Sequence, residues 1–150
     1  MTRRLGLAGA ALLMATLAVP ACSPRAEKPA ASEPKTATVE VSYDDLVNQK
    51  QISRTVELAV GDHLQVSLGS NASTGFQWED KMLISDPKVI TQTGHETVAP
   101  AADRPGAPGK EVWILQAVAP GDTTVSTTYG RPWPGGEKDS WVFTVNVKVS

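Results

Sequence analysis

The sequence predicts an all-β protein, an immunoglobulin-like β-sandwich of seven to eight strands. Apolar and polar residues alternate in several short segments, as in 62–68 and 141–149, which is typical of strands with one buried face. Turns rich in glycine and proline separate these segments at intervals of about 8–12 residues, the spacing of a sandwich. Beyond the N-terminal leader, no segment shows the 3.6-residue apolar period of a helix.

The N-terminus has the composition of an export signal. Residues 1–4 are basic, and the apolar run 5–19 is too short to be a convincing membrane span. The following Val19-Pro20-Ala21-Cys22 resembles a lipobox, in which the cysteine receives the lipid of a bacterial lipoprotein. We therefore expect residues 1–21 to be a lipoprotein signal peptide.

Lipid attachment at Cys22 would place the protein in the cell envelope, on the periplasmic face of a bacterial membrane. Ser23 after the cysteine is compatible with the outer membrane. Ordinary secretion, with cleavage near Ala21 and a free thiol nearby, is the alternative. Residues 22–37 are rich in proline, alanine and charge, so we expect a disordered tether, and 15 residues of it would reach at most roughly 50 Å.

Composition excludes several classes of function. Cys22 is the only cysteine, so the remaining domain, 38–150, has no disulfide and no thiol nucleophile. The net charge is −2, and loss of Arg3 and Arg4 with the signal makes it −4, which gives no support to a nucleic-acid partner. His63 and His95 lack the cysteine or acidic spacing of a zinc site. We expect no enzyme activity, no metal and no cofactor, and both histidines on a strand surface or edge.

The domain can be divided into strands in chain order. Residues 44–50 are expected to form a polar connection, and Pro87 prevents the irregular crossing segment 82–87 from continuing as helix. The last strand should bury Trp141 and Phe143 as major core anchors. The expected strands are 38–43, 52–60, 62–68, one that begins at 76, 89–98 with an interruption at Gly94, 111–118, 123–129 and 141–149.

Three connections are expected at one end of the sandwich, because successive antiparallel strands place alternate connections together. They are the small polar stretch 70–75 and the long loops 99–109 and 130–139. The first could simply be a solvated turn. Trp133 lies between Pro132 and Pro134, which disfavours strand pairing there. It is either an interface hot spot or a lid over the core, and composition alone leaves both open.

These three loops carry motifs that resemble the chagasin family of protein inhibitors of papain-like cysteine peptidases. That family has Asn-Pro-Thr-Thr-Gly, Gly-x-Gly-Gly and Arg-Pro-Trp/Phe, in this order, on an immunoglobulin-like sandwich. The resemblance covers about residues 38–149. The corresponding positions here are Asn71, Ala72, Ser73, Thr74 and Gly75, then Gly106, Ala107, Pro108 and Gly109, then Arg131, Pro132 and Trp133.

The resemblance implies a reversible, competitive inhibitor that acts as a wedge and is expected to be a monomer. The first loop would enter the catalytic groove with Ser73, Thr74 and Gly75 beside the cysteine and histidine of the target. Residues 106–109 and Trp133 would flank it on the unprimed and primed sides.

Three positions depart from the family pattern. Ala72 and Ser73 replace proline and threonine, which should loosen the first loop and raise the entropy cost of ordering it. Pro108 replaces a glycine and removes a backbone N–H, which should lower affinity if that group contacts the peptidase.

Two other readings use the same fold. An envelope-tethered binding module could take carbohydrate or another envelope protein, with Trp78, Trp113 or Trp133 stacking on sugar rings. A purely structural envelope protein is the third reading.

Overall fold

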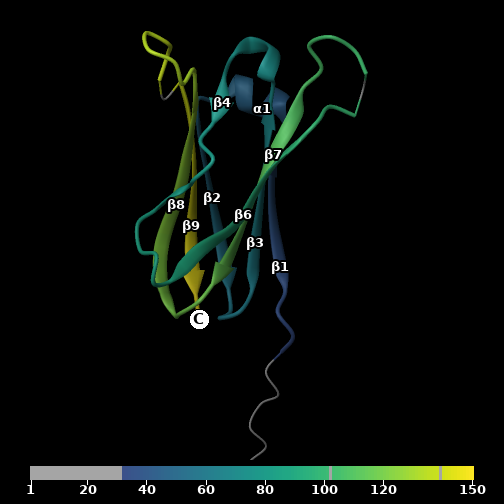
Figure 1. Cartoon of the computed structure of the whole chain (residues 1–150). Coiled ribbons are helices and arrows are strands. Elements are labelled where there is room, and N and C mark those ends of the chain that lie inside the picture. Colours follow the sequence, from purple (N-terminus) through teal and green to yellow (C-terminus); the bar gives the residue numbers. More distant parts are fainter. Residues whose placement is uncertain (1–31, 102, 139) are drawn as a thin grey trace, which may run out of the picture. The chain divides into compact units, whose positions relative to one another are not determined.

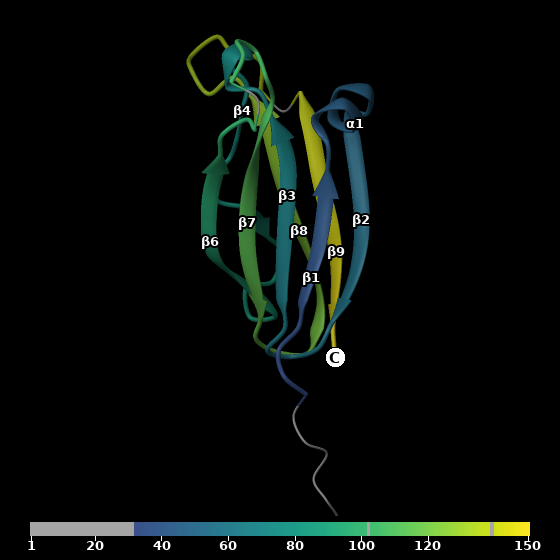
Figure 2. The same cartoon turned by 90° about the vertical axis from the view of Figure 1, so that its right-hand side faces the viewer.

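The computed structural model describes residues 32–101, 103–138 and 140–150. The expected signal peptide, the lipid site at Cys22 and most of the expected tether lie outside these residues. Two sheets face each other (Figures 1 and 2). One has the order β1-β3-β7-β6, and the other has the order β2-β9-β8-β4, with β5 also paired to β8.

The β-sandwich prediction is confirmed, with one very short strand, Leu83–Ile84, that was not expected. The strands are β1 (Thr36–Val41), β2 (Gln51–Leu58), β3 (His63–Ser70), β4 (Gln77–Trp78), β5 (Leu83–Ile84), β6 (Ile90–Val98), β7 (Gly109–Ala117), β8 (Gly121–Gly130) and β9 (Trp141–Val149). The described residues thus contain nine strands, more than the seven to eight expected, because the two-residue strand β5 leaves no alternating pattern to detect. The expected interruption at Gly94 is a register shift in β6 between Gln92 and Gly94.

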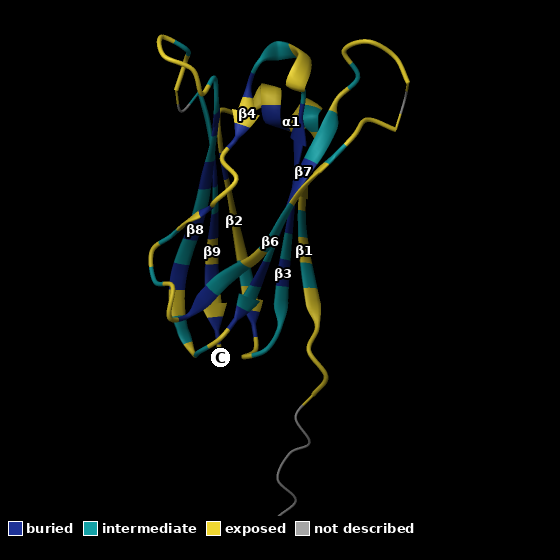
Figure 3. Ribbon diagram, in the orientation of Figure 1, coloured by how far each residue is buried: buried dark blue, intermediate teal, exposed yellow. Residues whose placement is uncertain are grey.

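The core lies between the sheets and is built from alternate residues of the central strands (Figure 3). The largest fully buried side chains are Trp113, Tyr129 and Phe143. Trp78 lies between two of them, with ring centroids 6.3 Å from Trp113 and 4.8 Å from Tyr129. Trp141, expected as a major anchor, is only partly buried and packs edge-on against Phe76 at 5.3 Å. The aromatic cluster therefore extends from the core toward the end where the loops lie.

The segment expected as a polar connection at 44–50 is instead mostly the helix α1 (Tyr43–Asn48). The side chain of Ser42 caps it by accepting the Asp45 N–H, and Leu46 is buried. Six residues are too few for a helical apolar period to be visible in the sequence. No helix among the described residues is long and apolar enough to cross a bilayer.

The boundary between tether and domain also differs from the expectation. Thr36 and Ala37, assigned to the tether, belong to β1 and pair in parallel with His63 and Leu64 of β3. The Lys35 N–H donates to Asp62 Oδ1 at 2.9 Å, which fixes the entry to the strand. The ordered domain begins earlier because pairing to β3, rather than local composition, decides where β1 starts.

Candidate functional site: three loops at one end of the sandwich

Three connections meet at one end of the sandwich, at the top of Figure 1. We call them the first loop (residues 71–76, after β3), the second loop (99–108, between β6 and β7) and the third loop (131–140, between β8 and β9). Their proximity follows from the register. Ser70 at the end of β3 pairs with Gly109 at the start of β7, and Gly130 at the end of β8 pairs with Gln77 of β4. The expectation that the three loops share an end is confirmed.

The first loop is a tight turn held by its own polar side chains. Residues Ala72–Thr74 form one turn of 3₁₀ helix, capped by Asn71, whose Oδ1 accepts the Ser73 N–H at 3.2 Å and the Ser73 hydroxyl at 2.6 Å. The Thr74 hydroxyl donates to the Asn71 carbonyl at 2.7 Å. Gly75 closes the turn at φ +79°, a left-handed conformation that favours glycine.

Asn71 also connects the first loop to the second loop and to the core. Its Nδ2 donates to the Gly106 carbonyl at 3.0 Å, and its backbone N–H donates to the Tyr129 hydroxyl at 3.0 Å. A hollow lies between the two loops, lined by Ala72 and Ser73 on one side and by Ala107 on the other. Asn71 thus joins the first loop to the second loop through its side chain and to the core through its backbone N–H.

Gly109 is not a loop residue but the first residue of β7. A Cβ at this position would lie 2.5 Å from the Val98 carbonyl oxygen, so the close approach of β6 and β7 requires glycine there. Pro108, just before it, stands where the family motif has a glycine, and Pro132 belongs to the Arg-Pro-Trp motif of the third loop. Pro132 is exposed and Pro108 precedes the strand.

Arg131 and Trp133 connect the third loop to the first. The guanidinium of Arg131 lies over the Phe76 ring, 4.4 Å from its centroid, and Nη2 donates to the Thr74 carbonyl at 3.4 Å. The six-membered ring of Trp133 covers Gly75, where an added Cβ would be only 2.4 Å from Cη2. Trp133 remains 46% exposed, so it lies on the outer edge and is not a lid over the core.

The third loop is closed by Lys138, which sequence reasoning missed. Its Nζ donates to the carbonyls of Arg131 at 2.7 Å and of Trp133 at 2.9 Å. The Arg131 N–H donates to the Glu137 carbonyl and the Gly136 N–H to the Trp133 carbonyl, so the turn that presents Trp133 is bonded at several points. No sequence signal marks this role, because a lysine in a polar loop is ordinarily solvated.

Burial beneath the first loop affects Tyr43 at the start of α1. Burial raises the pKa of Tyr43, and the nearby Tyr129 hydroxyl raises it further, while a hydrogen bond with the Asn71 side chain acts in the opposite direction. Tyr43 is therefore a neutral hydroxyl at physiological pH.

Of the tryptophans considered for sugar stacking, Trp78 and Trp113 are buried, and only Trp133 is available at the surface. His95 lies on the edge strand β6, as expected, but is partly buried between two carboxylates. Its Nε2 is 2.9 Å from Glu111 and its Nδ1 is 3.7 Å from Asp80. A single metal ion would bind only one of the two imidazole nitrogens. Here each nitrogen faces a different carboxylate, so the ring bridges Asp80 and Glu111.

Comparison with known proteins places this architecture in a family. The Chagasin family peptidase inhibitor I42 matches residues 57–147. Chagasin of Trypanosoma cruzi is 34% identical over 98 residues, which cover 64% of this chain and 89% of chagasin. Amoebiasin-2 of Entamoeba histolytica is 25% identical over 108 residues, covering 69% of this chain and 84% of that protein.

Solved structures share the fold at lower sequence identity. The cysteine protease inhibitor EhICP2 from Entamoeba histolytica has a TM-score of 0.57 at 19% identity and covers 77% of this chain and 96% of its own. PbICP-C, solved in complex with falcipain-2, has a TM-score of 0.52 at 21% identity. The match covers 77% of this chain and 98% of PbICP-C. The extent of the family match and the identity to chagasin show that this chain belongs to the chagasin family, whose members are peptidase inhibitors and not enzymes.

Proposed function

We propose that the chain is a reversible, competitive inhibitor of papain-like cysteine peptidases and that its three loops occlude the active-site groove of the target. The observation that carries this proposal is the joining of the loops into one exposed edge. The bond from Asn71 to Gly106, the bond from Arg131 to Thr74 and the cover of Trp133 over Gly75 hold that edge together.

The shape of the first loop supports inhibition without cleavage. A peptidase substrate lies extended in the groove, whereas residues Ala72–Thr74 form a helical turn. The Asn71 carbonyl already accepts the Thr74 N–H at 3.1 Å and the Thr74 hydroxyl at 2.7 Å. A turn that uses its own carbonyls in this way fills a groove without presenting a peptide bond in the geometry for attack.

The organisation of the edge also favours affinity. Ordering an interface costs about 0.5–1.5 kcal/mol for each immobilised flexible side chain. In this chain the first and third loops are already bonded before any partner binds. The exposed indole of Trp133 and the stacked guanidinium of Arg131 belong to two of the three residue types that dominate interface energies.

The test is titration of the full chain into papain with a fluorogenic substrate. We expect saturable, competitive inhibition that Thr74→Arg or Trp133→Ala weakens at least tenfold, about 1.4 kcal/mol. Leu83→Ala is the matched control, because Leu83 is an exposed apolar residue on β5, outside the three loops. Unchanged inhibition in both loop variants would rule out the proposed edge, and sugar-dependent tryptophan fluorescence without inhibition would favour a carbohydrate-binding module.

We also propose that the protein is anchored in a bacterial cell envelope through a lipid on Cys22. The support is the sequence pattern of residues 1–22. Mass spectrometry of the mature N-terminus tests this, and an unmodified chain that starts at Ser23 would contradict it.

A further inference from the structure

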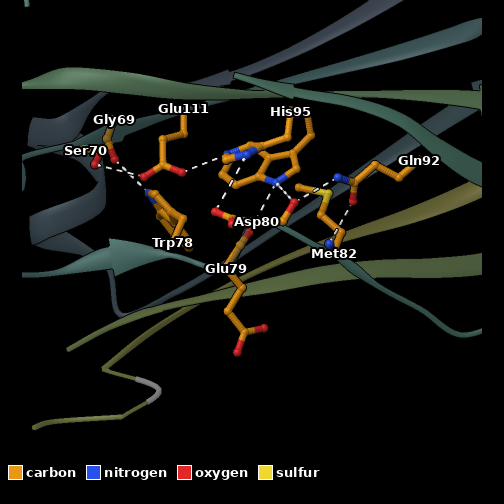
Figure 4. Close-up of polar contacts among 10 residues, drawn as sticks. Gly69, Ser70, Trp78, Glu79, Asp80, Met82, Gln92, His95 and Glu111 are labelled. Carbon is orange, nitrogen blue, oxygen red and sulfur yellow. Dashed lines mark hydrogen bonds and ion pairs between the residues drawn. The ribbon is translucent and has the colours of Figure 1, made fainter. Parts of the chain in front are cut away.

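A buried carboxylate lies where the first and second loops leave the sandwich. Glu111 of β7 is 6% exposed, and each of its oxygens has a partner (Figure 4). Oε1 accepts the Ser70 hydroxyl at 3.3 Å, and Oε2 lies 2.9 Å from His95 Nε2. A buried, ionised carboxylate is costly unless it is paired and hydrogen-bonded. The partner that can supply positive charge here is His95.

His95 is held in one orientation by its surroundings. Its ring stacks on Trp113 at a centroid distance of 5.0 Å, and its Nδ1 points to Asp80 Oδ1 at 3.7 Å. Trp113 Nε1 donates to the backbone carbonyls of Glu79 and Asp80 at 3.2 and 3.1 Å, which fixes the segment that carries Asp80. The imidazole is thus bounded by β7 on one side and by the β4–β5 segment on the other.

The two protonation states of this imidazole differ in how many N–H donors they present to the carboxylates. A neutral ring has one N–H and one lone pair, so one of its nitrogens would turn a lone pair toward a carboxylate. The imidazolium has an N–H on both sides and matches Glu111 and Asp80 together. Lys81, which lines a shallow hollow with His95, is the nearby cation, and Glu96 follows on the same strand but is exposed. The groups that face the ring are therefore mainly acidic.

This cluster connects directly to the proposed inhibitory edge. Ser70, which Glu111 holds, is the last residue of β3 and continues into Asn71, the residue that bonds both Gly106 and Tyr129. Glu111 itself lies two residues after Gly109, where the second loop joins β7. The carboxylate thus connects the two strand ends from which the first and second loops depart.

We propose that His95 is a pH-dependent positioning residue, whose imidazolium neutralises Glu111 and so aligns the first and second loops. Histidine side chains change charge between about pH 5 and 8. The ion pair is complete on the acid side of that range and is lost as the pH rises. The effect of this ion pair on inhibition through the loops rests on the proposed inhibitory function. Its effect on the stability of the domain does not.

The first experiment measures the fluorescence and the stability of the full chain in the absence of a peptidase. The tryptophan fluorescence of the chain includes that of Trp113, whose ring stacks on His95, so we expect a fluorescence change between pH 5 and 8 that His95→Gln abolishes. The ratio of folded to unfolded protein, measured by urea unfolding, should be higher for the native chain than for His95→Gln. This advantage of the native chain should be at least three times larger at pH 5.5 than at pH 7.5. This difference should vanish in the Glu111→Gln background.

His63→Gln is the matched control, because His63 is the other histidine of the chain and lies at the start of β3, remote from Glu111 in the β3–β7 register. It should keep the fluorescence change. A titration that survives in His95→Gln, or a stability ratio between the native chain and His95→Gln that does not vary with pH, would overturn the proposal.

The second experiment concerns the loops. The ratio of the papain inhibition constants of His95→Gln and the native chain, each measured at the same pH, cancels the titration of the enzyme. We expect a ratio of at least three at pH 5.5 that falls toward one at pH 7.5, and a constant ratio would refute the link to the loops. If the native chain does not inhibit papain, the proposed function fails, while the fluorescence and stability measurements still decide the role of His95.

Discussion

Replacing Gly75 by alanine should separate the stability of the sandwich from the integrity of the proposed inhibitory edge. Alanine at φ +79° costs about 1–2 kcal/mol because its Cβ crowds the backbone in the left-handed region. The new Cβ would also lie 2.4 Å from Trp133 Cη2 and 3.2 Å from Cζ3. Carbon atoms in contact prefer about 3.5–4.0 Å, so the ring must move by about 1 Å or more.

The ring is free to move because Trp133 is 46% exposed. The collision should therefore displace the indole rather than unfold the domain. Gly61→Ala is the matched control, since Gly61 has φ +93° with nothing within 4 Å of its added Cβ, in the turn between β2 and β3. The control carries a similar backbone cost without any contact to the loops.

Urea unfolding and papain inhibition measure the two effects separately. Both variants should lose about 1–2 kcal/mol of unfolding free energy. Only Gly75→Ala should also weaken inhibition, by about tenfold or more, which is about 1.4 kcal/mol. Equal inhibition constants for the two variants would refute the claim that the contact between Trp133 and Gly75 shapes the edge.

Three further predictions concern single positions. Lys138→Met should weaken papain inhibition by about 0.5–1.5 kcal/mol through loss of its bonds to two loop carbonyls, and Lys138→Arg should retain most of it. Gly69→Ala should lower the urea midpoint strongly, since its Cβ would lie 2.3 Å from the Tyr43 backbone nitrogen, and an unchanged midpoint would contradict this packing. Backbone N–H donors from Lys35 and Ala59 lower the pKa of Asp62. Its carboxylate therefore stabilises the fold above about pH 4, and this contribution is lost as the pH falls through the folded pKa. Asp62→Asn should lack that acid dependence in unfolding measured from pH 3 to 7.

The strands and the meeting of the loops could be predicted from the sequence for a common reason. Alternation such as Leu64, Val66, Leu68 records burial residue by residue, and all three are buried. Once the strands are placed, up-and-down connectivity brings the three motif-bearing loops to one end. The helix at Tyr43–Asn48 and the start of β1 at Thr36 were not predicted, because they depend on contacts with β3 that no local sequence pattern records.

The site residues that the sequence could not reveal act through long-range geometry. His95 looked like an ordinary edge histidine because its partners Asp80 and Glu111 lie 15 and 16 residues away in the chain. Lys138 looks like any solvated lysine in a polar loop, and its role comes from the bonds that it donates to two backbone carbonyls. Trp78 and Trp113 looked available for stacking, yet their place between facing sheets buries both. In each case the deciding information is which strands become neighbours.

The parallel pairing of Thr36 with His63 has a practical consequence for how the molecule can be displayed. Because β3 runs from His63 toward Asn71, the chain before Thr36 leaves the domain at the pole opposite Trp133. Ser150 lies at that same pole, bonded to Leu58 and Val60 (Figure 1). A bead or a fluorophore coupled at Ser150, or just before Thr36, would therefore be attached at the end of the domain opposite the three loops.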